Sequence, residues 1–448
     1  MNFRLQALMG LLIVASFTAC NTPPVQQSAF PKWIAQSNIY EVNVRQYTPE
    51  GTFAAFSNHL PRLREMGVDI LWFMPITPIS VADRKGERGS YYAVADYTAV
   101  NPEFGTLDDW KALVKKAQGM GFKVIIDWVA NHTGADNRWI KTNPEFFVTD
   151  AKGNLQYAFD WSDTRDLDYW NPVLRDSMIH AMKFWVTETG IDGFRCDVAA
   201  EVPRMFWEEA IRQLKQVKPD IFMLAEADVA WVHDAGFHAS YGWDGFAKMK
   251  QVAKGEKSAR VLDTVLRHLD ETFKPGAIKM YFTSNHDENS WNKADYETMP
   301  GPIHAPFAVL TQTWKNTLPL IYSGQEEPHL DSLSFFYKDT IHFSKFERAP
   351  FYKTLLELRK ANPALAVDAD YKKLRTTNDD AIYAYLRSKG NSKVLVILNL
   401  SGAQQQFQLL DAAAAGTYNN VFRTAKETIT NGAAMQLQPW EYFVCEVR

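Results

Sequence analysis

Three carboxylates occupy positions from which paired acid and base chemistry could be carried out. Asp197 ends the segment Gly-Phe-Arg-Cys-Asp, and Glu226 ends the mostly apolar segment Ile-Phe-Met-Leu-Ala-Glu twenty-nine residues later. Asp287 follows after a further sixty-one residues. The apolar neighbours of Glu226 are expected to raise its pKa by desolvation, so that it can carry a proton.

A cation accompanies the first of these carboxylates. If residues 193–198 form a strand, alternation places Arg195 and Asp197 on the same face. Two opposite charges that point into a protein interior are costly unless they pair, so we expect Arg195 to keep Asp197 ionised at a low pKa. A purely structural ion pair is the alternative interpretation of these two residues taken alone.

The elements that must position the carboxylates alternate between short β-rich runs and amphipathic helices. This alternation predicts parallel βαβ units. Strands are predicted at 39–45, 70–75, 124–129, 193–198, 222–226, 279–284 and 318–323, with a weaker one at 236–241. Helices are predicted at 107–120, 172–189, 203–217, 259–272 and 351–361. Eight such units predict an α/β fold of the closed (β/α)₈ TIM-barrel class. An open doubly wound sheet is disfavoured because it usually carries a G-x-G-x-x-G turn, which this sequence lacks.

The three carboxylates then lie at the C-terminal ends of predicted strands. In a TIM barrel this is the face on which active sites are built. The catalytic barrel is expected to span residues 38–365, with a small inserted domain at 131–171, because a connection of about forty residues in a compact domain is usually functional. Separated strands at 381–387, 393–400, 405–410 and 442–447, with Asn and Gly turns, predict a C-terminal all-β domain, a β-sandwich, at 366–448.

The N-terminus has the features of an export signal. A positive charge at Arg4 precedes a mostly apolar run that ends before Cys20, too short to span a membrane as a mature helix. The ending Phe-Thr-Ala-Cys resembles a bacterial lipobox, so residues 1–20 are predicted to be a lipoprotein signal peptide with a lipid anchor at Cys20. A plain secretory signal is the alternative. Asn21 favours the outer membrane of a Gram-negative cell, and the polar, Pro-containing segment 21–37 suits a flexible tether.

Composition narrows the class of partner. The net charge of −4 over 448 residues leaves no basic excess to neutralise phosphates, so nucleic acid is not expected as a partner. Aromatic residues make up 13% of the chain, which fits either large cores or flat rings along a sugar cleft. Cys196 and Cys445 are expected to be two separate buried thiols.

Four short segments carry a resemblance to a known family. They are Asp-Trp-Val-Ala-Asn-His at 127–132, the segment 193–197, Glu226, and Asn-His-Asp at 285–287. A fifth lies at 91–105, which contains Tyr-Tyr-Ala-Val-Ala-Asp-Tyr and Asn-Pro-Glu-Phe-Gly. Together they resemble the signatures of the α-amylase family of glycoside hydrolases, in the same order, and the resemblance covers nearly all of residues 38–448.

The resemblance implies a retaining mechanism. Asp197 would attack the anomeric carbon, Glu226 would serve as acid and then base, and Asp287 would bind sugar hydroxyls and stabilise the transition state. Such double displacement requires carboxyl groups about 5–5.5 Å apart. The resemblance further implies that His132 and His286 bind hydroxyls of the same sugar. By the same resemblance, Arg195 would position Asp197, and Asp127 would support the site by hydrogen bonding. Tyr92 would stack beneath the sugar ring, with Tyr91 as the alternative.

Calcium is the cofactor that the resemblance suggests. Many family members hold Ca²⁺ between the barrel and the insert, and Asn131 and Asp166 match two of the ligands. Hard oxygen donors suit this ion. However, the usual Lys-His after the nucleophile strand is replaced by Ala200 and Glu201, which leaves both calcium and the neighbouring sugar subsite open. A transition-metal site at the histidines is disfavoured because no H-E-x-x-H motif or thiolate cluster occurs.

The expected activity is hydrolysis of internal α-1,4 bonds of starch-like glucans and maltooligosaccharides. A neopullulanase-like, maltogenic or transglycosylating enzyme of the same family is one alternative. A lipid-anchored α-glucan-binding protein that has lost its chemistry is another, although none of the three carboxylates is missing.

Overall fold

The computed structural model describes residues 30–293, 299–329 and 331–448. The predicted signal peptide, Cys20 and most of the tether lie outside these ranges; of the tether, the described part contains a 3-10 turn, η1 (Lys32–Ile34). Within the described residues, no helix is long and apolar enough to cross a membrane.

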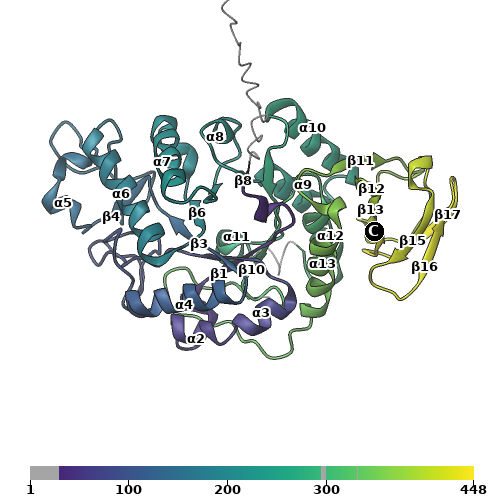
Figure 1. Cartoon of the computed structure of the whole chain (residues 1–448), viewed down its shortest axis with the longest axis horizontal. Helices are drawn as coiled ribbons and strands as arrows, with labels where there is room; N and C mark the ends of the chain where they lie inside the picture. The colour runs from purple at the N-terminus through teal and green to yellow at the C-terminus, as the bar shows by residue number, and fades with distance from the viewer. Residues whose placement is uncertain (1–29, 294–298, 330) are drawn as a thin grey trace, which may run out of the picture.

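Eight parallel strands form the predicted barrel (Figure 1). They are β1 (Ile39–Val42), β2 (Ile70–Phe73), β3 (Lys123–Trp128), β6 (Gly193–Cys196), β7 (Phe222–Ala225), β8 (Ala239–Tyr241), β9 (Ile278–Met280) and β10 (Leu320–Tyr322). The hydrogen-bonded order runs β10-β1-β2-β3-β6-β7-β8-β9, and a parallel bridge between Lys279 and Thr317 closes the circle. The barrel prediction is therefore confirmed, and each strand occurs where the sequence placed it.

The strands are shorter at their C-terminal ends than predicted. The run predicted at 39–45 stops pairing at Val42, because helix α1 (Val44–Tyr47) begins two residues later. The run predicted at 279–284 pairs only to Met280 as a strand. Residues beyond these points leave the sheet and enter the loops that surround the C-terminal mouth, where the carboxylates lie.

Most of the helices cover the outside of the barrel, whereas α11 (His286–Asn292) lies at its C-terminal mouth. The covering helices are α2 (Phe53–Ser57), α3 (Leu60–Met66), α4 (Leu107–Gly119), α6 (Pro172–Thr189), α7 (Arg204–Val217), α8 (Trp231–Asp234), α9 (Trp243–Ala253), α10 (Leu262–Thr272), α12 (His304–Thr313) and α13 (Ala349–Ala361). Local chemistry fixes their ends. A capping box between Thr106 and Asp109 begins α4, and Asn171 caps α6 with Pro172 at its first position.

Three long connections rise above the mouth of the barrel. The one after β3 holds β4 (His132–Gly134), β5 (Thr164–Asp166), the one-turn helix α5 (Trp139–Thr142) and the 3-10 turn η2 (Pro144–Phe146). Its apolar side chains belong to the same hydrophobic cluster as the barrel helices. The other two lie at 74–106 and 323–348. The sequence drew attention to the motif at 91–105 but not to the length of these connections, because their apolar residues do not follow a helix or strand period.

The C-terminal part is an all-β domain beside α12 and α13, yellow in Figure 1. One sheet has the order β11-β12-β13-β18-β15-β16 and a second pairs β14 with β17. The strands are β11 (Asp370–Leu374), β12 (Ile382–Lys389), β13 (Ser392–Asn399), β14 (Gln405–Gln408), β15 (Gly416–Asn420), β16 (Lys426–Ile429), β17 (Ala434–Leu437) and β18 (Tyr442–Val447). The predicted strands correspond to β12, β13, β14 and β18. The other four escaped prediction because they are short, polar and partly exposed.

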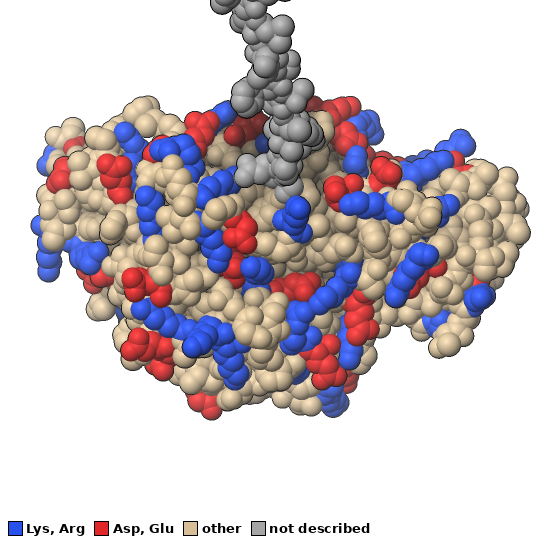
Figure 2. Space-filling view, viewed as in Figure 1, with Lys and Arg blue, Asp and Glu red and all other residues tan. Residues whose placement is uncertain are grey.

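Two further sequence expectations can be compared with the structure. Cys196 and Cys445 are both buried and unbonded, which confirms two separate thiols. On the face shown in Figure 2, acidic and basic side chains are interspersed, consistent with the small net charge.

Candidate active site

A fully buried arginine links the predicted catalytic carboxylates. Arg195 lies on β6 and points into the barrel, where its Nη1 donates to Asp127 Oδ1 at 2.8 Å and to Asp197 Oδ1 at 3.1 Å. Its Nη2 forms an ion pair with Glu226 Oε2 at 2.9 Å, and its Nε donates to the Tyr241 hydroxyl. Arg195 therefore contacts Asp127 on β3 and the two carboxylates that directly follow β6 and β7.

The turn after β6 directs a backbone N–H towards the carboxylate of Glu226. Val198 has φ 33° and ψ 48°, a left-handed conformation that a β-branched residue rarely adopts. In this conformation its N–H donates to Glu226 Oε2 at 2.7 Å. Strained backbone of this kind concentrates at functional sites, where the surrounding structure maintains it.

The pKa of Asp197 differs from the sequence expectation. Burial, together with the nearby carboxylate of Glu226, raises the pKa of Asp197 well above its usual range, and the opposing effect of Arg195 is smaller. The prediction that Arg195 would keep this pKa low is wrong for the free site, because burial and the carboxylate of Glu226 outweigh the arginine.

Glu226 has more polar contacts than the apolar residues around it in the sequence suggest. It follows β7, whose residues are fully buried. Its carboxylate accepts from Val198 and pairs with Arg195, so its surroundings are not purely apolar. Strand alternation explains the difference, because the neighbouring side chains pack into the core while the carboxylate turns towards the barrel mouth.

The third carboxylate stands at the start of a helix. Asp287 is in the first turn of α11, which Asn285 caps by accepting from Glu288 N. Its Oδ2 lies 3.3 Å from His286 Nε2, and about a third of its side chain is exposed. The helix N-terminus favours a carboxylate at this position.

Tyr92 and His286 connect the remaining predicted residues. The Tyr92 hydroxyl donates to Asp127 Oδ2 at 3.0 Å and lies 2.7 Å from His286 Nε2. Tyr91, by contrast, donates to Asn43 beneath the guanidinium of Arg45 and does not line the cavity. Of the two adjacent tyrosines, the structure thus brings only Tyr92 to the carboxylates.

His132 also faces this space. Burial lowers its pKa to about 3, so the ring is neutral. Its Nδ1 lies 3.3 Å from the Asn131 amide nitrogen, and within the described part of the chain its Nε2 has no protein partner.

These side chains surround a cavity of about 550 Å³. The predicted residues on its wall are Tyr92, His132, Asp197, Glu226, His286 and Asp287. The insert contributes Trp161, and the loops after β9 and β10 contribute Trp291, Phe335 and Phe336. Flat rings around a polar floor suit a sugar, which presents apolar C–H faces and hydroxyl edges.

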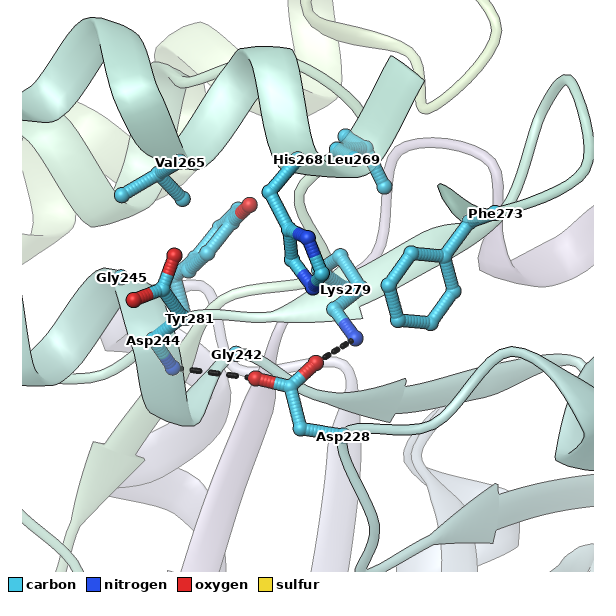
Figure 3. Close-up of a pocket in the computed structure, with 10 residues that line it drawn as sticks. All are labelled: Asp228, Gly242, Asp244, Gly245, Val265, His268, Leu269, Phe273, Lys279 and Tyr281. Atoms are coloured by element: carbon cyan, nitrogen blue, oxygen red, sulfur yellow. Dashed lines mark hydrogen bonds and ion pairs between the residues drawn. The ribbon is translucent and has the colours of Figure 1, made fainter. Parts of the chain in front are cut away.

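A second cavity between α9, α10 and β9 has a different character (Figure 3). Lys279 donates to Asp228 there at 2.6 Å, and Asp228 accepts from the backbone of Asp244. Its volume of about 10 Å³ has room for no more than one water, so it is not a sugar site.

The two predicted calcium ligands are neighbours. Asn131 directly precedes β4, Asp166 ends β5, and the pairing of His132 with Asp166 brings them together. Burial raises the pKa of Asp166, and the carboxylate of Asp168 acts in the same direction. Among the described residues, no three His, Cys, Asp or Glu side chains are grouped to bind a metal. Asn131 and Asp166 themselves offer amide and carboxylate oxygens, the kind of donor that a hard cation prefers.

Sequence reasoning did not identify several residues of this site. Glu41 of β1 contacts His286, and Tyr241 of β8 contacts Arg195. A charged residue in the otherwise apolar strand at 39–42 was the available signal for Glu41. The aromatic wall had no such signal, since its members come from separate loops.

A (β/α)₈ barrel whose C-terminal mouth holds an arginine-linked carboxylate pair under an aromatic-walled cavity is the architecture of a glycosidase. Comparisons with known proteins specify the family. A sequence model of the α-amylase catalytic domain matches residues 28–392, and one of the C-terminal domain of the α-amylase SusG matches residues 382–444. The chain belongs to the α-amylase family of glycoside hydrolases.

Individual relatives are similar over most of this chain. The α-amylase MalA of Haloarcula japonica is 27% identical over 410 residues, which cover 86% of this chain and 58% of that protein. This chain therefore spans just over half the length of that relative. The crystal structure of the maltogenic α-amylase AmyB from Thermotoga neapolitana has a TM-score of 0.83 and 30% identity, covering 92% of this chain and 98% of AmyB. The crystal structure of an α-amylase from Lactobacillus plantarum has a TM-score of 0.81 and 30% identity, covering 93% of this chain and 100% of that α-amylase.

Proposed function

We propose that this protein is a retaining, endo-acting α-amylase that cleaves internal α-1,4-glucosidic bonds of starch-like glucans. The observation that supports this proposal best is the pair Asp197 and Glu226, held by one buried guanidinium and facing the aromatic-walled cavity. The family membership supports the substrate class.

The contacts divide the chemical work between the two carboxylates. Asp197 Oδ1 accepts from Arg195, while Oδ2 has no partner among the described residues and is the oxygen that attacks the anomeric carbon. Both contacts of Glu226 fall on Oε2, which leaves Oε1 to hold the proton for the leaving glycosidic oxygen. After the leaving sugar departs, Glu226 takes a proton from water, and the water oxygen displaces Asp197 from the sugar.

The surrounding residues bind and orient the sugar at the cleavage point. Asp287 and the two histidines accept from and donate to its hydroxyls, and the face of Tyr92 supports its ring. Because both histidines and Tyr92 are buried, these donors and acceptors are fixed before the substrate arrives, which is the condition for strong electrostatic stabilisation.

A product time course tests this function. On soluble starch, the purified protein should release a range of maltooligosaccharides early, and Asp197→Asn should release none at the same concentration. Predominant early maltose, or cleavage of pullulan to panose, would favour the maltogenic or neopullulanase-like alternative, for which the similarity to AmyB is the specific observation. Longer products from maltotriose would indicate transglycosylation. Binding of maltoheptaose with no products would favour a silent glycan-binding protein.

Calcium binding at Asn131 and Asp166 is a further part of the proposal. The ion would hold the insert to the barrel and would take no part in bond cleavage. A calorimetric titration with CaCl₂ should show binding to the chelator-treated protein and weaker binding to Asp166→Asn. Equal heats for both proteins, or no heat for either, would contradict this site.

The location of the protein is also proposed from sequence alone. Lipidation at Cys20 would anchor the enzyme to the outer membrane of a Gram-negative cell, with 21–37 as the tether. The intact precursor expressed in such a cell should partition into detergent, and Cys20→Ala should remain in the aqueous phase. Aqueous partition of both would contradict the anchor.

A further inference from the structure

Glu41 is a buried carboxylate that the proposed mechanism does not use. It is the third of the four residues of β1, faces the barrel interior and has no exposed surface. Its Oε1 lies 2.6 Å from His286 Nδ1. The other ring nitrogen, Nε2, lies 2.7 Å from the Tyr92 hydroxyl and 3.3 Å from Asp287 Oδ2. His286 is therefore held between a carboxylate on one side and a hydroxyl and a second carboxylate on the other.

When Glu41 is ionised, the hydrogen-bond directions fix the protons on this ring. The Tyr92 proton is committed to Asp127, so the Tyr92 oxygen can only accept, and His286 Nε2 must donate. On the opposite side, an ionised Glu41 can likewise only accept, so Nδ1 must donate as well. A ring that donates from both nitrogens is an imidazolium.

The charges around the pair support the same state. Burial alone would lower the pKa of His286, but Asp287 and Glu41 outweigh it and raise this pKa to about 9. Arg195 of β6 opposes them, and Asp127 of β3, Tyr241 on β8 and Tyr322 on β10 are further titratable groups that act on Glu41 or on which it acts. Burial raises the pKa of Glu41, and His286 and Arg195 oppose this rise only in part.

We propose that Glu41 is a positioning residue that keeps His286 a cation and fixes its ring beneath the sugar-binding cavity. This inference rests on the proposed function, because the cation matters for catalysis only if a glucan occupies the cavity. The same cavity then presents one charged imidazole, His286, and one neutral imidazole, His132. The charged ring donates from Nδ1 to Glu41 and from Nε2 to the Tyr92 oxygen, with Asp287 Oδ2 3.3 Å from Nε2, and it remains charged well above neutral pH.

Titration of the histidine side chains by ¹⁵N NMR tests the proposal directly, because ¹⁵N shifts distinguish an imidazolium from either neutral tautomer. In the unsubstituted protein, the His286 ring should be doubly protonated at pH 7 and should titrate near pH 9. In Glu41→Gln it should titrate near or below the ordinary value of about 6.5. Glu41→Asp retains the negative charge, so His286 should stay protonated at pH 7.

Glu326→Gln is the matched control. Glu326 is also a fully buried carboxylate paired with a cation, Arg62, at 2.9 Å. It accepts from Tyr40, the neighbour of Glu41 on β1, but it lies on the side away from His286. This variant should leave the His286 titration unchanged. A neutral His286 ring at pH 7 in the unsubstituted protein, with the proton on Glu41, would overturn the proposal, and so would an unchanged titration in Glu41→Gln.

Activity provides a second measurement. For a group that titrates at about 6.5, only about 3% stays protonated at pH 8, so kcat/KM of Glu41→Gln should fall about 30-fold between pH 5.5 and pH 8. The unsubstituted enzyme and Glu326→Gln should lack this decline. If no protein hydrolyses starch, the proposed function fails, while the NMR titration still decides the role of Glu41.

Discussion

The adjacent residues Tyr91 and Tyr92 allow a matched test of the site. Both are buried tyrosines with a hydrogen-bonded hydroxyl, but only Tyr92 lines the cavity. Replacing each with Phe removes one oxygen atom and leaves the ring. The two variants therefore differ in which partners lose a bond and in little else.

The contacts set the expected magnitudes. Tyr92 bonds two charged groups, Asp127 at 3.0 Å and His286 at 2.7 Å, and hydrogen bonds to charged groups contribute about 1.5–3 kcal/mol. Tyr91 donates to Asn43 at 3.1 Å, a neutral acceptor for which about 1 kcal/mol is typical, and its other polar contacts, with Arg45 and Gln46, also lie outside the cavity. If about 2 kcal/mol of the Tyr92 interaction is retained in the transition state, Tyr92→Phe lowers kcat/KM roughly 30-fold. Tyr91→Phe should change kcat/KM by less than about twofold.

Initial rates on maltoheptaose, with urea unfolding of the same preparations, provide the assay. Tyr92→Phe should lose much more activity than Tyr91→Phe even where both remain folded. Equal losses of kcat/KM for the two variants would refute the assignment of Tyr92 to the cavity, as would a larger loss for Tyr91→Phe.

Two further predictions concern stability and substrate binding. Burial lowers the pKa values of His233 and His238 to about 3, and in the unfolded chain both should titrate near 6.5. The unfolded chain therefore binds more protons between these values, and the free energy of unfolding should fall by up to about 1.4 kcal/mol per pH unit for each histidine as pH drops from 6.5 towards 3. Urea midpoints at pH 7 and 5 measure this, and a smaller dependence is expected when both are replaced by Gln. Trp291→Ala should raise KM for long glucans roughly tenfold, because a cavity-wall ring that packs against Phe335 is lost. Trp170→Ala removes a more exposed ring outside this cavity and should leave KM unchanged, so equal effects would count against the aromatic wall.

The barrel can be predicted from the sequence because each strand and helix is marked by the pattern of residues within its own short segment. Each strand is an apolar run bounded by a helix, and alternation within 193–198 is enough to orient Arg195 and Asp197 together. The position of a carboxylate at the end of such a run then places it at the barrel mouth. For the same reason the polar strands β15 to β17 were missed, since their residues lack the alternation that marks a half-buried strand.

The electrostatics of the site could not be predicted in this way. The pKa of Asp197 depends on its burial and on the carboxylates of Glu226 and Asp127, which come from other parts of the chain, as well as on Arg195. The role of Glu41 depends on His286, which is 245 residues away in the chain. The left-handed backbone at Val198 follows from packing around the turn and has no sequence signal.

Trapping the covalent intermediate tests the central claim most directly. A fluorinated maltosyl fluoride reacts quickly with a retaining enzyme and leaves slowly, so intact-mass measurement followed by peptide mapping identifies the nucleophile. We predict a single glycosyl adduct on Asp197, and no adduct on Asp197→Asn. An adduct on Glu226, or turnover without any adduct and with inverted anomeric configuration of the product, would contradict the roles that the structure supports for this pair.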